Sequence, residues 1–206
     1  MLICETHFTT ISHFSNPGYK TCFAYHPDGK AHGDTAILIK SAIAYTERIS
    51  YVKPELQATI IEVHAPHRKI VVASTYCPPR FKLKPAQFTS FFKFLGACFV
   101  VGGDFNCKHT LWGSRLITNK GRELAAVIEK ENYSVLSTGY PTYWPTYPQK
   151  TPDLLDFFVT FGFSSSYADI VSSYDLSSDH TPIIATISKS ITTTKRPPRL
   201  HNSRTN

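Results

Sequence analysis

The 206 residues include 42% apolar and 13% aromatic side chains, enough to bury the core of a single large α/β domain. No apolar run is long enough to span a bilayer, and the first residues lack the features of a signal peptide. We therefore expect a soluble intracellular protein with no membrane partner. The formal charge of +7 suggests a polyanionic partner, but five of the 22 basic residues, and no acidic one, lie from Lys189 onward. The preceding part has 17 basic and 15 acidic residues, so the basic character belongs mainly to the C-terminal end.

The five cysteines are scattered, odd in number and never in a CxxC pair. This spacing indicates reduced thiols and excludes a disulfide framework or a zinc knuckle as the organising principle.

Apolar runs bounded by Gly, Pro, Asp or Ser predict strands, and two stretches of helical periodicity interrupt them. In chain order the expected strands cover 2–4, 35–39, 58–63, 70–76, 99–101, 154–159 and 183–187. One helix is expected after Pro85, where Phe88, Phe91, Phe92 and Leu95 recur at helical spacing, and another after Gly121. The mixture predicts a layered α/β sandwich. We expect one domain over residues 1–188 and a basic flexible tail over 189–206, where apolar periodicity ends.

Two motifs place reactive groups beside these strands. The strand at 99–101 runs into Gly102-Gly103-Asp104-Phe105-Asn106, which reads as a turn carrying an acid and an amide, and Ser178-Asp179-His180 precedes the strand at 183–187. Taken singly, each motif fits a turn or a helix cap equally well. Asp156 lies within an apolar run, and because a buried carboxylate needs a partner, we expect it to pair with His180.

Five pieces in this order resemble the endonuclease/exonuclease/phosphatase superfamily: Glu5-Thr6, Ser74-Thr75-Tyr76, Gly103-Asp104-Phe105-Asn106, Asp156 and Ser178-Asp179-His180. Further segments, Trp112-Gly113-Ser114, 119–124 and 151–156, resemble the endonuclease domain of non-LTR retrotransposons of the jockey and R1 kind. The resemblance implies a DNase I-like four-layer α/β sandwich, with two mixed β-sheets face to face and helices outside. It further implies an endonuclease that nicks DNA, with a reverse transcriptase domain in the parent polyprotein and a nuclear site of action.

The resemblance also implies roles for individual residues. Glu5 would bind Mg²⁺, or alternatively Mn²⁺, and Asp104 would orient or deprotonate the attacking water with the help of Asn106. His180, oriented by Asp156, would contact a phosphate oxygen. Tyr76 would donate to the reacting phosphorus centre, Asp179 would support the metal or the phosphate, and the product would carry the 3′-hydroxyl that target-primed reverse transcription needs.

The aromatic segment from Tyr140 to Tyr147 allows two interpretations. Trp144 could contact the substrate, by pressing into a DNA groove or stacking on a flipped base, or the segment could be a surface turn with packed aromatics.

Members of the resembled superfamily begin with a strand bearing an Asn and then a helix, and this first strand-helix unit is expected to be missing before Glu5. Weak or absent activity is the corresponding hypothesis. Two alternatives to a DNA endonuclease therefore stay open. One is a phosphoesterase acting on a small phosphorylated substrate, and the other is a catalytically impaired retroelement remnant that only binds nucleic acid.

Overall fold

The computed structural model describes residues 1–9, 14–24, 33–66, 68–147, 149–163, 168–174 and 178–187. The strands are β1 (Leu2–Cys4), β2 (Tyr19–Ala24), β3 (Thr35–Lys40), β4 (Tyr45–Glu47), β5 (Tyr51–Lys53), β6 (Leu56–Ala65), β7 (Arg68–Tyr76), β8 (Phe99–Asp104), β9 (Ser134–Leu136), β10 (Asp156–Phe161), β11 (Ala168–Ser172) and β12 (Ile183–Ile187). The helices are α1 (Pro85–Leu95) and α2 (Asn119–Glu131), with a 3-10 turn at Thr110–Trp112. The predicted tail over 189–206 lies outside the described residues.

A seven-stranded sheet forms the centre of the molecule, in the order β4-β6-β7-β8-β10-β9, with β5 also paired to β6. The sheet is mixed, because β7 and β8 run parallel and their neighbours antiparallel. Parallel neighbours need a long connection, and α1 supplies it between β7 and β8. The register of β8 with its neighbours places the last residues of β7 and β8 and the first residue of β10 at the same level of the sheet.

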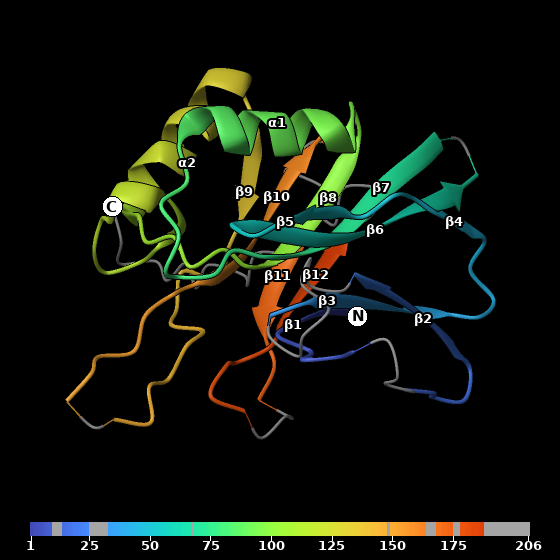
Figure 1. The fold of residues 1–206 in the computed structure, drawn as a ribbon, viewed down its shortest axis with the longest axis horizontal. Helices are drawn as coiled ribbons and strands as arrows, with labels where there is room; N and C mark the ends of the chain where they lie inside the picture. Colours follow the sequence, from blue (N-terminus) through green and yellow to red (C-terminus); the bar gives the residue numbers. More distant parts are fainter. Residues whose placement is uncertain are drawn as a thin grey trace, which may run out of the picture.

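Helices α1 and α2 lie over one face of this sheet, and the sheet β1-β3-β2 lies against the other (Figure 1). This arrangement confirms the DNase I-like sandwich class. The seven-stranded sheet is mixed as expected, whereas β1-β3-β2 and β11-β12 are two separate antiparallel sheets within the described residues. Three of the expected four layers are present in this part of the chain, because both described helices lie over the seven-stranded sheet. Neither described helix is long and apolar enough to cross a membrane.

Two apolar cores hold the three layers together. The larger lies between the helices and the seven-stranded sheet and contains Phe88, Phe91 and Phe92 of α1, all buried. The smaller lies between the two sheets and contains Cys22, Ile37, Ile39 and Ile61. The periodicity that predicts the helices is thus explained by burial of one helical face against the sheet.

The helix boundaries follow from capping. Pro85 occupies the first turn of α1, and the Gln87 side chain accepts from the Lys84 backbone N–H at 2.8 Å. Helix α2 begins at Asn119, two residues before Gly121, because Thr118 Oγ1 accepts from the Gly121 N–H at 3.1 Å. Both predicted helices are confirmed, the second with this earlier start.

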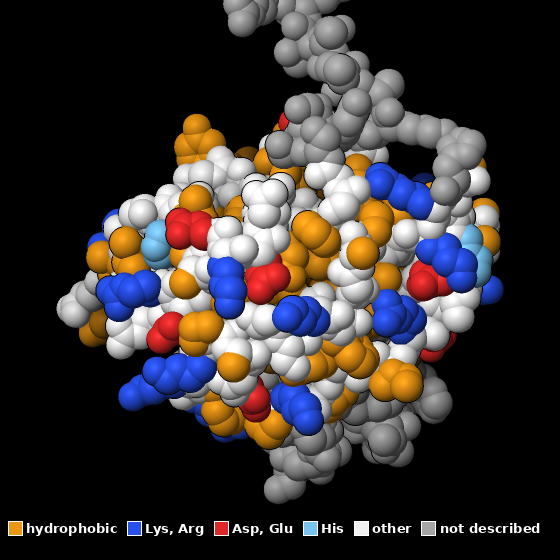
Figure 2. Space-filling view, turned by 90° about the horizontal axis from the view of Figure 1, so that it is seen from above, with side chains coloured by type: hydrophobic (Ala, Val, Ile, Leu, Met, Phe, Trp, Pro, Cys, Tyr) orange, Lys and Arg blue, Asp and Glu red, His pale blue; other side chains and the backbone are white. Residues whose placement is uncertain are grey.

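The surface over the helices does not gather charge of one sign. Figure 2 shows Lys and Arg side chains on this face interspersed with acidic and apolar ones. The pattern agrees with the near balance of charge before the C-terminal tail.

Gly102 and Gly103 lie inside strand β8, so the interpretation of this pair as part of a turn is wrong. Close packing explains both residues. A Cβ on Gly102 would lie 2.4 Å from the Phe158 ring, and one on Gly103 would lie 2.0 Å from the Thr75 carbonyl oxygen. Gly103 also has φ of 147°, which L side chains rarely adopt.

We expect Gly103→Ala to lower the free energy of unfolding by about 3 kcal/mol, because the added methyl meets backbone that cannot withdraw. Gly18→Ala is the matched control, since Gly18 also has positive φ but has no atom within 4 Å of an added Cβ. The control change should cost about 1 kcal/mol from backbone strain alone. Urea unfolding followed by circular dichroism measures both, and equal losses would contradict the packing explanation.

Candidate active site

Polar side chains form a row across the ends of three neighbouring strands. Tyr76 is the residue of β7 paired with Asp104 of β8, and Asp104 in turn pairs with Asp156 of β10. Paired residues on adjacent strands lie about 5 Å apart, so Asp104 has as immediate neighbours Tyr76, 28 positions before it in the chain, and Asp156, 52 positions after it. The sheet register thereby brings together three of the predicted catalytic residues.

Asp104 is held by Asn106, which the resemblance had assigned to help it. The Asn106 backbone N–H donates to Asp104 Oδ1 at 2.8 Å, and its side-chain Nδ2 donates to Oδ2 at 2.6 Å. Asn106 reaches both oxygens because its φ is 47°, a left-handed conformation that Asn tolerates better than most residues. Asp104 is 4% exposed. Burial first, and then the charge of Asp156, raise the pKa of Asp104 well above its usual value, although His180 and Asn106 act in the opposite direction.

The predicted pairing of Asp156 with His180 is confirmed, with Nδ1 and Oδ2 2.7 Å apart. Burial alone lowers the pKa of His180. The hydrogen bond and charge of Asp156, followed by the charges of Asp104 and Asp179, outweigh burial and raise this pKa to about 9. At neutral pH the imidazole is therefore a cation that donates from Nδ1 to Asp156 and has Nε2–H left for another acceptor.

Thr142 positions this pair, and nothing in the sequence marked it. Its fully buried side-chain hydroxyl accepts from the N–H groups of Leu155 at 3.0 Å and Asp156 at 2.9 Å. Its carbonyl oxygen accepts from the Thr181 N–H at 2.6 Å. One residue thus fixes the backbone on both sides of the Asp156–His180 pair, a role that depends on contacts far apart in the chain.

Trp144 lies next to this pair on the segment between β9 and β10, which extends away from the body in Figure 1. Its backbone N–H donates to the Asp179 carbonyl at 2.7 Å, and its indole N–H donates to Thr181 Oγ1 at 2.9 Å. The side chain is 48% exposed. Trp144 is therefore anchored by its polar atoms while half of its surface faces solvent beside the site.

Glu5 approaches the row from the other sheet. Strand β1 is docked onto β7 and β8, because Ser74 Oγ donates to the Ile3 carbonyl at 2.9 Å and Cys4 Sγ donates to the Thr75 carbonyl at 3.1 Å. Burial, followed by the hydrogen bond and charge of Glu5, raises the pKa of Tyr76, so its hydroxyl stays protonated. The charge of Glu5 also acts on Asp104.

The site carries more carboxylates than cations. Asp104, Asp156 and Asp179 act on the His180 imidazolium, while Glu5 acts on Asp104 and Tyr76. Both Glu5 and Asp179 are exposed. Within the described part of the chain, no three His, Cys, Asp or Glu residues form a complete metal site. Mg²⁺ commonly uses one or two carboxylates, several waters and a substrate phosphate, so the oxygen-rich donor set with an exposed Glu5 fits such an ion.

Comparison with known proteins gives the family. The model of the family described as Endonuclease-reverse transcriptase matches residues 70–184, more than half of the chain. The RNA-directed DNA polymerase from mobile element jockey of Drosophila funebris is 34% identical over 185 residues, which cover 90% of this chain and 20% of that protein. The Drosophila melanogaster jockey protein is 35% identical over 200 residues, 97% of this chain and 22% of that protein. The chain thus spans about a fifth of the length of these curated relatives.

Solved structures agree on the fold. The endonuclease domain of TRAS1, a telomere-specific non-LTR retrotransposon, superposes with a TM-score of 0.68 at 19% identity, covering 84% of this chain and 81% of that one. The catalytic domain of Xenopus laevis APE2 gives a TM-score of 0.57 at 14% identity, covering 92% and 86%. The resemblance drawn from the motifs is confirmed, and the chain belongs to the Endonuclease-reverse transcriptase family, with the DNase I-like fold of retrotransposon endonuclease domains.

Proposed function

We propose that this chain nicks DNA by divalent-metal-dependent hydrolysis of a phosphodiester bond and leaves a 3′-hydroxyl for reverse transcription by its parent polyprotein. The row of Tyr76, Asp104 and Asp156, with His180 hydrogen-bonded to Asp156, carries the proposal, because it brings a base, a cation and a neutral donor together. Family membership supports a nuclease.

In this proposal the Asp104 carboxylate takes a proton from the attacking water while Asn106 holds its orientation. A raised pKa suits a general base that works near neutral pH. The His180 imidazolium and the Tyr76 hydroxyl donate to the non-bridging phosphate oxygens, where negative charge develops. Asp156 keeps His180 charged and oriented.

The bond between phosphorus and the 3′ oxygen breaks, which leaves a 5′-phosphate and a 3′-hydroxyl. Glu5 would hold the metal ion, with Asp179 nearby, and the ion would neutralise charge on the scissile phosphate when bound. Trp144 would contact the DNA beside the cut through the exposed part of its indole.

A supercoiled-plasmid assay with Mg²⁺ tests the proposal. Asp104→Asn and His180→Gln should each slow nicking by at least about 100-fold, because one removes the base and the other the cation. Glu129→Gln, an exposed change on α2, should leave the rate unchanged. EDTA should stop nicking, and the nicked plasmid should prime a DNA polymerase without prior phosphatase treatment.

Equal nicking by the wild type and both site variants would identify the cutting as contamination. Release of phosphate from an inositol phosphate without any plasmid nicking would instead assign the chemistry to a small substrate.

We expect an NMR titration to place the pKa of His180 near 9 and to show it lowered in Asp156→Asn, where burial acts without the opposing carboxylate. Because the folded pKa is raised, the pair stabilises the fold fully below the ordinary His value of about 6.5. That contribution is lost as pH rises through about 9. Glu129→Gln is the control, and an unchanged titration in Asp156→Asn would refute the charge-holding role of Asp156.

A further inference from the structure

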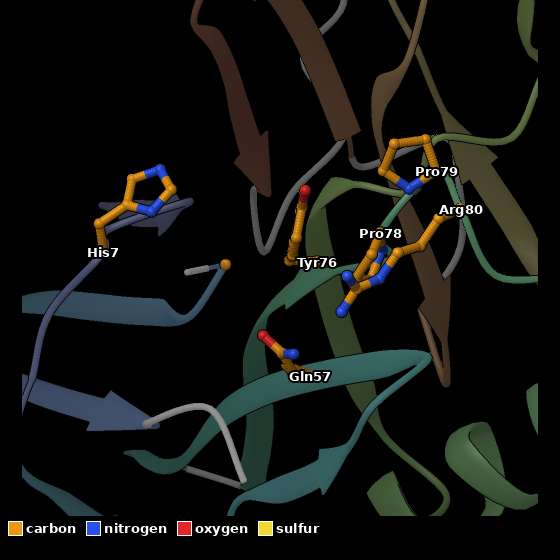
Figure 3. Close-up of a pocket in the computed structure, with 7 residues that line it drawn as sticks. His7, Gln57, Tyr76, Pro78, Pro79 and Arg80 are labelled. Carbon is orange, nitrogen blue, oxygen red and sulfur yellow. The ribbon is translucent and has the colours of Figure 1, made fainter. Parts of the chain in front are cut away.

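A pocket opens beside Tyr76, on the side away from Asp156 in the strand order. It has a volume of about 230 Å³, and its walls come from His7 in the segment that follows β1, from β6, and from the end of β7 with the loop that follows (Figure 3). Its volume is below the roughly 300 Å³ at which pockets for drug-sized ligands begin. The pocket is therefore suited to a small group rather than to a whole nucleotide.

Arg80 supplies the charge in this pocket. Its guanidinium is directed into the cavity in Figure 3 and lies 4.8 Å from the centre of the Phe81 ring, which supports it from one side. No ion pair joins Arg80 to another residue of the described part of the chain. The planar fork of an arginine matches two oxygens of a phosphate, so this guanidinium is poised for such a ligand.

Gln57 supplies a second donor from the floor of the pocket. The residue is 1% exposed, and its Oε1 accepts from the Asp34 N–H at 2.9 Å, so Nε2 carries the free donors. Nε2 is buried and has no hydrogen-bond partner in the described structure. A buried amide without a partner is costly, which makes Nε2 an independent indication that the pocket takes an acceptor.

No Asp or Glu lines the pocket, and the one side-chain carbonyl there already accepts a hydrogen bond. His7 faces the cavity from the opposite side, and Tyr76 belongs both to this pocket and to the catalytic row. The surplus of donors over acceptors selects an anion. Because Tyr76 is shared, an anion held here lies next to a phosphate held at Asp104 and His180.

We propose that this pocket binds the phosphate adjacent to the scissile one on the cut strand, with Arg80 as the main contact and Gln57 Nε2 as a buried donor. The inference rests on the proposed function, since it places the backbone of the same DNA strand. It makes Arg80 a substrate-binding residue whose effect on affinity needs neither metal nor hydrolysis.

The first experiment measures binding of a labelled DNA duplex in EDTA by fluorescence anisotropy over a range of salt concentrations. Arg80→Gln should weaken binding about tenfold at low salt and reduce the slope of log K against log salt by about 0.9, the loss of one phosphate contact. Lys93→Gln, an equal change of charge on the exposed last turn of α1, should change neither. Arg80→Lys should restore the slope and only part of the affinity, because it keeps the charge without the fork.

An affinity and slope for Arg80→Gln equal to those of Lys93→Gln would overturn the proposal, as would a wild type with no salt-dependent binding. Circular dichroism confirms that each variant is folded.

The second experiment distinguishes the strand phosphate from a free anion. A duplex with one uncharged methylphosphonate next to the cut bond should be nicked about tenfold more slowly by the wild type, and Arg80→Gln should show no further loss on this duplex. Binding of inorganic phosphate at Arg80 without this methylphosphonate effect would identify a free-anion site and overturn the proposal.

The two proposals fail separately. If the wild type binds DNA through Arg80 but never nicks it, the proposed role of this pocket is supported and the proposed hydrolysis is refuted. If the wild type nicks DNA and Arg80→Gln binds DNA as tightly as the wild type, the proposed hydrolysis stands and the proposed role of this pocket is refuted.

Discussion

The pairing of β8 with a parallel neighbour on one side and an antiparallel neighbour on the other is the constraint on which the site depends. It aligns Tyr76, Asp104 and Asp156 at one level of the sheet. A shift of either pairing by one residue would turn the partner's side chain to the opposite face. Gly103 makes the alignment possible, since only a residue without Cβ lets β8 approach the Thr75 carbonyl this closely.

The buried strands and helices could be predicted because buried positions are apolar and recur with the period of the element. Apolar runs predicted β1, β3, β6, β7, β8, β10 and β12, and helical periodicity predicted α1 and α2. The strands β2, β4, β5, β9 and β11 were missed because they are short or half-exposed and their residues lack a long apolar run. Their stability comes from pairing with neighbours, which local pattern does not contain.

Some residues of the site could likewise be predicted from sequence, and others could not. Asp156 could be paired with His180 from sequence, because an acid inside an apolar run demands a partner. Thr142 and Gln57 could not be found, since a hydroxyl or an amide is ordinary in sequence and gains its role from a single distant contact. The catalytic roles of Glu5, Tyr76, Asp104, Asn106, Asp179 and His180, and substrate contact by Trp144, stay predictions until activity is measured.

Backbone hydrogen bonds join the two ends of the segment that carries Trp144. Tyr143 and Asp153 exchange backbone hydrogen bonds at 3.0 and 3.1 Å, and Thr142 holds the backbone of Asp156 just beyond them. Because both ends are clamped to each other, the stretch between Pro145 and Pro152 can gain or lose residues without displacing the Asp156–His180 pair. Changes in the length of this loop would therefore alter the surface beside Trp144 and leave the geometry of the Asp156–His180 pair in place.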